Sequence, residues 1–305
     1  MPSSGWKVFW RKPISLAPGL RGRQDAAMQP SNGADVPAPK FEVPCAKCTV
    51  VIGHSHIMAL FYVQQDQIDA WQAPTIHLHW ILLQDREFQP NIVTEGNRTV
   101  LSPAVRRRLD KEIASLREVP PFLCASIGGN EYQFIGHVEH PRPFDFSLPE
   151  RPDLAVRCGV EIIAPSLMRK TLERSMAHSL SVMSALREAT SLPIVFLQPP
   201  PPVASADYIR ANAGPFQEAI QQNGVASASV RMKLWLLQSS IYRQRCDDLG
   251  CRYLEVPREV VDSSGFLQES ASWPDSVHGN RVYGASVIRW IDQEFQKSRE
   301  AEVTQ

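Results

Sequence analysis

The sequence predicts an α/β fold in which a five-stranded parallel sheet lies between two layers of helices. After residue 45, short apolar segments bounded by turn residues alternate with amphipathic segments. Strands that alternate with helices indicate a parallel sheet covered on both faces. The chain has 305 residues, 43% of them hydrophobic, which is enough to form such a core. Because crossover connections are right-handed, we expect a three-layer α/β/α, flavodoxin-like domain with strand order 2-1-3-4-5.

The expected strands are short and mostly apolar, and they cover residues 48–53, 75–83, 121–129, 192–198 and 251–257. Alternation in the second strand places His77 and His79 on one face. In a doubly wound sheet, ligands bind beyond the carboxyl ends of the strands, at the switch point between the first and third strands. We therefore expect functional residues in the loops that follow these two strands.

Four amphipathic segments are expected to form the main helices, at residues 102–117, 166–190, 229–249 and 281–297. Ser102 is a favourable N-cap, Pro103 a favourable first helical residue and Gly250 a natural stop. Apolar residues recur at helical spacing in each: Val105, Leu109, Ile113 and Leu116; Leu172, Met176, Leu180, Met183 and Leu186; Val230, Leu234, Leu237 and Ile241; Ile288, Ile291 and Phe295.

Composition argues against several classes of protein. Lys plus Arg equals Asp plus Glu, 32 each, so the chain lacks the basic excess typical of nucleic-acid binding. No apolar stretch approaches the roughly 20 residues of a membrane span, and the start lacks the apolar run of a signal peptide. The six scattered cysteines are typical of reduced thiols, so the expected location is the cytoplasm. The oligomeric state is not predicted.

Residues 1–44 are expected to be a disordered N-terminal tail, and residues 45–305 a single catalytic domain. The tail is rich in Pro, Gly, Ser and charge and shows no sustained periodicity. Met28 is an alternative start of the chain.

Polar side chains occupy the expected strand ends. The loop after the first strand carries Ser55, the loop after the third carries Asn130, and the segment before the last helix carries Asp275 and His278. Acyl transfer needs such a set, because a serine hydroxyl is a weak nucleophile without a base. His278 can act as the base if Asp275 fixes its tautomer. The Ser55 backbone N–H, the Asn130 amide and a glycine N–H can stabilise the oxyanion.

The sequence motifs "GHS" (53–55), "GGN" (128–130) and "DSVH" (275–278) occur in the order of the SGNH (GDSL-like) hydrolase superfamily, which the chain resembles over about residues 46–298. The resemblance implies Ser55 as nucleophile, His278 as base and Asp275 as its partner. It further implies an oxyanion hole formed by Ser55, Asn130 and a second-block glycine, for which Gly96 fits best.

Two residues depart from the family pattern. His54 stands where the family usually has aspartate, and Glu131 stands where aspartate is frequent. The family's aspartate at the position of His54 does not transfer the proton, so we expect the Ser55–His278–Asp275 triad to be intact despite this difference. Trp273 either lines the substrate pocket and stacks on a sugar or packs the loop.

Metal binding is the competing hypothesis for the histidines. His54 and His56, His77 and His79, and His137 and His140 form close pairs in the sequence. Cys45 and Cys48 have the spacing of half a zinc site or of a redox pair. No His-Glu-x-x-His helix and no second Cys pair of that spacing accompanies them. We therefore expect no metal and no cofactor.

The expected function is that of a serine esterase acting through an acyl-serine intermediate on short acyl esters of small molecules or carbohydrates, such as carbohydrate O-acetyl groups. One alternative is an O-acyltransferase that uses the same residues. Another is a non-catalytic carbohydrate-binding protein with the same fold. The acyl chain and the alcohol part of the substrate are not predicted.

Removing residues 1–40 is expected to leave the thermal stability of the protein unchanged, because the composition of this segment cannot bury much apolar surface. Thermal melting of the shortened and full-length chains checks this expectation. A melting temperature lower by more than a few degrees would show that the segment packs on the domain.

Overall fold

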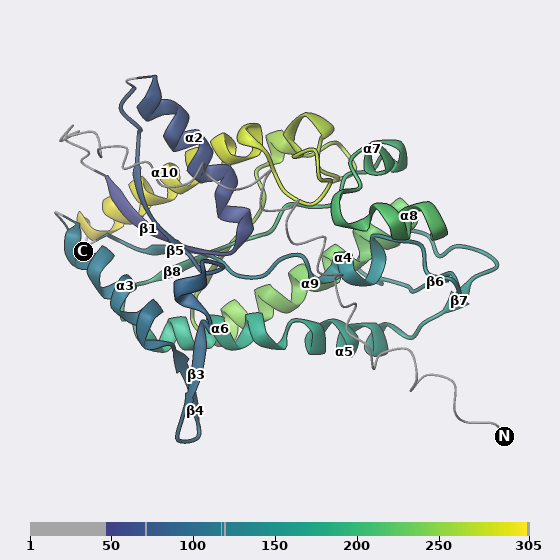
Figure 1. Ribbon diagram of the computed structural model, residues 1–305, viewed down its shortest axis with the longest axis horizontal. Helices are drawn as coiled ribbons and strands as arrows, with labels where there is room; N and C mark the ends of the chain where they lie inside the picture. The colour runs from purple at the N-terminus through teal and green to yellow at the C-terminus, as the bar shows by residue number, and fades with distance from the viewer. Residues whose placement is uncertain (1–46, 71, 117, 119, 304–305) are drawn as a thin grey trace. The chain divides into compact units, whose positions relative to one another are not determined.

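Five parallel strands form the central sheet, in the order β2-β1-β5-β8-β9 (Figure 1). The strands are β1 (Cys48–Gly53), β2 (His77–Leu82), β5 (Leu123–Ser126), β8 (Ile194–Leu197) and β9 (Arg252–Leu254). Numbered within this sheet, the order is 2-1-3-4-5, so both the fold class and the strand order predicted from the sequence are confirmed. The structure is a computed structural model that describes residues 47–70, 72–116, 118 and 120–303. The predicted tail, at residues 1–44, and Cys45 lie outside the described residues.

Helices cover both faces of the sheet, as the three-layer prediction requires (Figure 1). Along β1 the side chains alternate: Val51 packs in the cluster under one helical layer, and Val50 and Ile52 pack in the cluster under the other. The first layer consists of α2 (Met58–Asp69) and α10 (Arg281–Val303). The second consists of α3 (Pro103–Ser115), α5 (Pro165–Ser175), α6 (Ala177–Ala189) and α9 (Ala228–Asp248).

The helices differ from the prediction in two places. The helix expected at 166–190 is divided at Met176, whose φ of −83° and ψ of −4° end α5 and begin α6. The segment contains no glycine or proline that would signal this break. The last helix extends to Val303 instead of ending at residue 297. The predicted apolar stripes nevertheless face the core in all four regions.

Smaller elements connect the main ones. The hairpin β3 (Ile92–Glu95) and β4 (Arg98–Leu101) packs on α6, and β6 (Phe144–Asp145) pairs with β7 (Glu161–Ile162). The short helices are α4 (Glu131–Gly136), α7 (Ala206–Ala211) and α8 (Gln217–Asn223). Single turns of 3-10 helix are η1 (Ser55–Ile57), η2 (Arg86–Phe88), η3 (Gly214–Phe216), η4 (Arg258–Val260) and η5 (Glu269–Ala271).

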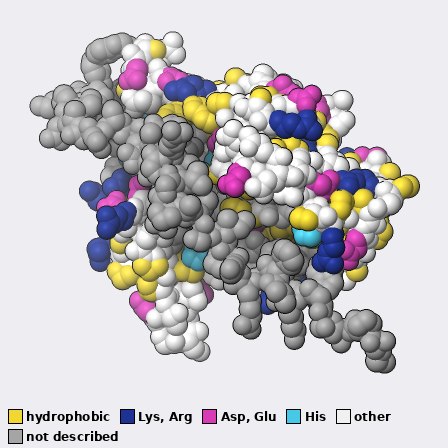
Figure 2. Space-filling view, turned by 45° about the vertical axis from the view of Figure 1, so that its right-hand side comes forward, with side chains coloured by type: hydrophobic (Ala, Val, Ile, Leu, Met, Phe, Trp, Pro, Cys, Tyr) yellow, Lys and Arg dark blue, Asp and Glu magenta, His cyan; other side chains and the backbone are white. Residues whose placement is uncertain are grey.

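Charges of both signs are interspersed on the face of the molecule shown in Figure 2, in keeping with the equal numbers of acidic and basic residues. One ion pair is fully buried: Lys233 Nζ on α9 lies 2.9 Å from Asp145 Oδ1, and both side chains have no solvent exposure. This pair joins the β6 segment to α9. In the part of the chain that the structure describes, no helix combines the length and the apolar character needed to cross a bilayer.

Candidate active site

The loops after β1 and β5 are joined at the carboxyl ends of these neighbouring strands. The backbone N–H of His54 donates to the carbonyl of Ser126 at 2.9 Å. A Cβ on Gly53 would lie 2.3 Å from that same carbonyl oxygen, so only glycine permits this approach. The first turn after β1 is η1, and it begins with Ser55. The serine therefore stands at the switch point of the sheet, where the topology predicts a ligand site.

Ser55, His278 and Asp275 form a continuous hydrogen-bonded chain. Ser55 Oγ lies 2.8 Å from His278 Nε2, and His278 Nδ1 lies 2.7 Å from Asp275 Oδ2. The side chains of His278 and Asp275 are only 15% and 21% exposed. This is the geometry in which a neutral histidine can remove the serine proton while a carboxylate holds its other nitrogen.

The turn that carries Asp275 and His278 is fixed by its own backbone. Asp275 Oδ1 accepts hydrogen bonds from the backbone N–H groups of Val277 and His278, at 2.9 and 3.0 Å. Burial alone would raise the pKa of Asp275, but hydrogen bonds and charge from His278, together with these N–H groups, lower it below its usual value. Asp275 is thereby held as a carboxylate with both oxygens occupied.

Behind this turn, Ser276 has a positive φ of 55° and is 5% exposed. Its hydroxyl donates to the Asp275 carbonyl at 2.7 Å and lies 3.2 Å from Nε2 of the buried His137. His137 thus supports the turn from inside the protein. We did not predict this role, because the two residues are 139 positions apart in the sequence.

The loop after β5 is held by side chains from the second helical layer. Glu131, at the start of α4, accepts from Gly129 N at 2.8 Å, from Ser179 Oγ at 2.6 Å and from the Tyr242 hydroxyl at 3.2 Å. The Gln238 amide donates to the Gly129 carbonyl and accepts from Tyr132 N. The loop that carries Asn130 is therefore anchored on both sides.

His54, which replaces the family's usual aspartate, joins the two loops. Its Nδ1 accepts the backbone N–H of Gly128 at 3.0 Å. Burial lowers the pKa of His54, against the opposing effects of a hydrogen bond with Asn91 and the charge of Glu131. The ring is thus kept neutral, which leaves a lone pair free to accept the hydrogen bond.

Two of the three predicted oxyanion donors, Ser55 and Asn130, lie in the loops that follow β1 and β5. Ser55 is the first residue of η1, so its backbone N–H lacks an intrahelical partner. Asn130 directly follows Gly129 at the N-terminal end of α4. The N–H groups of Gly128 and Gly129 are bound to His54 and Glu131, so these glycines are not free donors.

The prediction that Gly96 contributes to the oxyanion hole is corrected by the structure. Gly96 lies in the turn of the β3–β4 hairpin, which projects away from the strand ends (Figure 1). It is exposed and has a φ of +62°, and a Cβ built on it meets no atom within 4 Å. Gly96 serves the left-handed conformation of this exposed hairpin turn.

Two alternative roles were predicted for Trp273: it packs the loop, or it lines the substrate pocket and stacks on a sugar. Its ring stacks on Tyr62 of α2, with centroids 5.8 Å apart and planes 15° from parallel, and the Arg281 guanidinium lies near both rings. The stacking on Tyr62 agrees with the alternative in which Trp273 packs the loop. Whether Trp273 contacts a substrate is untested by the structure, and that role stays a prediction.

The histidine pairs of the sequence have separate surroundings. His77 and His79 lie in β2, an edge strand of the sheet. His79 Nδ1 lies 2.9 Å from Glu112 Oε2, and the His77 ring packs edge-on against the His79 ring. Within the described ranges, no group of three or more His, Cys, Asp or Glu side chains is arranged to hold a metal ion. The structure describes Cys48 but not Cys45, so the Cys45–Cys48 hypothesis lies outside what it shows.

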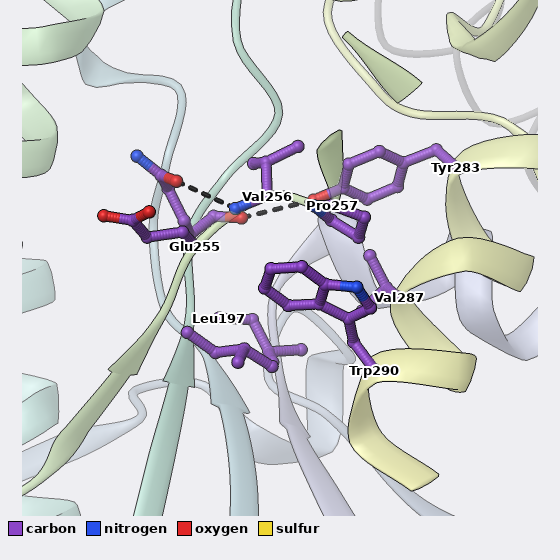
Figure 3. A pocket seen from close by; sticks show the side chains of 9 residues that line it. Leu197, Glu255, Val256, Pro257, Tyr283, Val287 and Trp290 are labelled. Carbon is purple, nitrogen blue, oxygen red and sulfur yellow. Dashed lines mark hydrogen bonds between the residues drawn. The ribbon is translucent and has the colours of Figure 1, made fainter. Parts of the chain in front are cut away.

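The pocket in Figure 3 is not at the triad. It lies between the end of β9 and α10 and is lined by Leu197, Gln198, Leu254, Glu255, Val256, Pro257, Tyr283, Val287 and Trp290. None of the predicted site residues borders it. We therefore assign the chemistry to the hydrogen-bonded triad and not to this pocket.

No family model matches the sequence, and no curated protein matches it. The chain is similar in structure to a GDSL-like lipase from Bacteroides thetaiotaomicron, with 13% identity, a TM-score of 0.41, and coverage of 91% of this chain and 96% of the lipase. It is also similar to an acetyl-xylooligosaccharide esterase from Geobacillus (10% identity, TM-score 0.35, 82% and 94% covered). A third is the periplasmic domain of a Salmonella Paratyphi A lipopolysaccharide acetyltransferase (14% identity, TM-score 0.35, 86% and 85% covered).

At these identities and TM-scores the likeness carries no argument about activity. The chemistry assigned to this chain therefore rests on the geometry of its own residues.

Replacing His54 tests the hydrogen bond that connects the loop after β1 to the loop after β5. In His54→Leu the Gly128 N–H loses its acceptor, which should lower the free energy of unfolding by about 1–3 kcal/mol. His54→Asp restores an acceptor and should lose less. Urea denaturation of the three proteins measures the difference, and equal losses in both variants would contradict the proposed contact.

Acid is expected to destabilise the protein through its buried histidines. Burial lowers the pKa of His54, lowers that of His56 to about 3, and lowers that of His137 to about 4. As the pH falls below about 6.5, the unfolded chain takes up protons that the folded chain does not, so stability decreases.

The free energy of unfolding should therefore fall between pH 6.5 and 5, where these histidines and not Asp275 titrate in the unfolded chain. Urea denaturation at several pH values provides the measurement, and His137→Phe should reduce the slope. Constant stability over this interval would show that the three rings bind protons as well in the folded as in the unfolded state.

Proposed function

We propose that the protein is a serine esterase that acts through an acyl-serine intermediate. The observation that carries this proposal is the hydrogen-bonded chain from Ser55 Oγ to His278 Nε2 at 2.8 Å, and from His278 Nδ1 to Asp275 Oδ2 at 2.7 Å. A serine that serves only as a turn residue has no need for a histidine and a partly buried carboxylate aligned behind it.

In the first half of the reaction, Ser55 Oγ attacks the ester carbonyl carbon while His278 Nε2 takes the hydroxyl proton. The carbonyl oxygen becomes an oxyanion, which the Ser55 backbone N–H and the Asn130 side-chain amide stabilise. The bond to the alcohol oxygen then breaks, and His278 gives its proton to that oxygen. The products are the free alcohol and an acyl group on Ser55.

In the second half, a water molecule attacks the acyl-serine and His278 takes a proton from it. The tetrahedral intermediate collapses to the carboxylic acid, and His278 returns the proton to Ser55 Oγ. Asp275 stabilises the imidazolium in both halves without itself accepting a proton. Because Asp275 Oδ1 is held by two backbone N–H groups, it keeps the imidazole in one orientation throughout.

The proposed substrates are short acyl esters, such as O-acetyl groups on a carbohydrate. This part of the proposal follows from the family resemblance of the sequence motifs. An alcohol that replaced water in the second half would make the same residues an acyltransferase. Separating products after incubation with p-nitrophenyl acetate and an added sugar distinguishes the two: hydrolysis gives acetate alone, and transfer gives an acetylated sugar.

Ser55 is expected to be the serine that a fluorophosphonate probe labels, because the probe needs both an activated hydroxyl and an anion site. Ser55→Ala should abolish labelling and p-nitrophenyl acetate hydrolysis, and His278→Ala should lower kcat by about 10⁴-fold or more. Asp275→Asn should also lower kcat steeply while the protein stays folded. Peptide mass mapping identifies the labelled residue.

The matched control is Ser115→Ala, which removes an exposed hydroxyl on α3 that, among the described residues, donates to the Glu112 carbonyl. Labelling and hydrolysis should both persist in this variant. The proposed function would be wrong if the label were found on another serine, or if Ser55→Ala hydrolysed the ester at the wild-type rate.

A further inference from the structure

His56 is a buried polar residue beside the triad to which the proposed mechanism gives no role. It follows Ser55 in η1 and is 5% exposed. Its ring centroid lies 5.0 Å from that of His278. Neither ring nitrogen closes a hydrogen bond with any part of the chain that the structure describes. An imidazole without partners in such a place costs free energy, so its presence calls for an explanation.

The ring is held close to the loop that carries Asn130. A Cβ on Gly129 would lie 2.8 Å from Cδ2 and Nε2 of His56, so the ring fills the space that this glycine leaves open. Asn130 is the next residue, and its Oδ1 is also buried without a hydrogen-bond partner among the described residues. A donor and an acceptor, each buried and unsatisfied, thus lie on adjoining segments.

The protonation state of His56 suits a donor to this oxygen. Burial and the neighbouring His278 lower the pKa of His56 to about 3, although the Asn130 side chain, which interacts with the ring, opposes the shift. The ring is therefore neutral at physiological pH, with one N–H donor and one lone pair. Because Oδ1 of Asn130 points inward, the tautomer that complements it presents the N–H to that oxygen.

We propose that His56 is a positioning residue whose ring N–H binds Asn130 Oδ1 and thereby directs Asn130 Nδ2 at the oxyanion of the tetrahedral intermediate. This inference rests on the proposed esterase function.

The need for such a contact follows from the symmetry of the amide group. Rotating the Asn130 side-chain amide by half a turn exchanges its oxygen and nitrogen, and an oxygen directed at the oxyanion would repel it. Gln238 and Glu131 fix the backbone on either side of Asn130, but neither contacts its amide. The His56 ring is buried against this loop with both nitrogens unpaired among the described residues, and an N–H donated from it to Oδ1 would distinguish the two orientations.

A double-mutant cycle tests this inference, with kcat and KM for p-nitrophenyl acetate as the readout. The variants are His56→Leu, Asn130→Ala and the double variant, with His56→Gln as the conservative replacement that keeps an N–H donor. Asn130→Ala should lower kcat by about 10²–10³-fold, as for one lost oxyanion donor. His56→Leu should lower kcat by about 10–100-fold with little change in KM, as for a lost supporting contact.

If His56 acts through Asn130, adding His56→Leu to Asn130→Ala should lower kcat no further. His56→Gln should recover part of the activity lost in His56→Leu. Because His56→Leu leaves Asn130 Oδ1 buried without a donor, its melting temperature should fall. A purely structural role would instead lower kcat in the Asn130→Ala background as well.

The outcomes separate the inference from the function on which it rests. Multiplicative effects in the double variant, or full activity in His56→Leu, would overturn the positioning role while leaving the esterase proposal intact. A wild-type protein without Ser55-dependent hydrolysis would overturn both. An effect of His56→Leu on kcat that appears only when Asn130 is present would support the inference.

Discussion

The close approach of β1 to β5 at their carboxyl ends is the constraint on which the site depends. Gly53 lies against the carbonyl of Ser126, and the N–H of His54 binds that same carbonyl. This contact sets where η1 begins and so where Ser55 stands. It also brings together the loops that carry Ser55 and Asn130. A larger residue at position 53 would push the two strand ends apart and separate these loops.

The carboxylates of the candidate site, Asp275 and Glu131, are both held in place by hydrogen bonds. The triad contributes one carboxylate, Asp275, whose oxygens are both occupied by hydrogen bonds. The opposite loop contributes Glu131, whose oxygens bind Gly129 N, Ser179 and Tyr242. Neither carboxylate is left to approach the reaction centre, where a negative charge would oppose a developing oxyanion. His54, whose ring is neutral, adds no negative charge to these loops.

Much of the fold was predictable from the sequence because its signals are local. Short apolar segments between turn residues identified all five strands of the sheet, and their alternation with helices predicted the order. The members of the triad were predictable because each stands at a strand end or in the turn before the last helix. Their roles in catalysis remain predictions, although the structure brings the three side chains together.

The sequence predictions failed, or were missing, for features that depend on contacts between residues far apart in the chain. Gly96 was assigned to the oxyanion hole because a turn glycine has the same sequence signature whether it stands in a hairpin or in an active site. Met176 interrupts a helix without any glycine or proline nearby. The contacts of Gln238 and Tyr242 with the Asn130 loop span more than 100 residues of sequence, so no local pattern could reveal them.

The packing of α10 against α2 has a consequence for when the site forms. Ser55 lies three residues before the start of α2, and His278 lies three residues before the start of α10. The two helices pack through residues such as Leu60, Ile288 and Ile291. Ser55 and His278 are 223 residues apart in the chain. During synthesis Ser55 emerges early, whereas His278 emerges much later and reaches Ser55 only when α10 folds onto α2. Ser55 therefore has no imidazole at its hydroxyl until the packing of these two helices is complete.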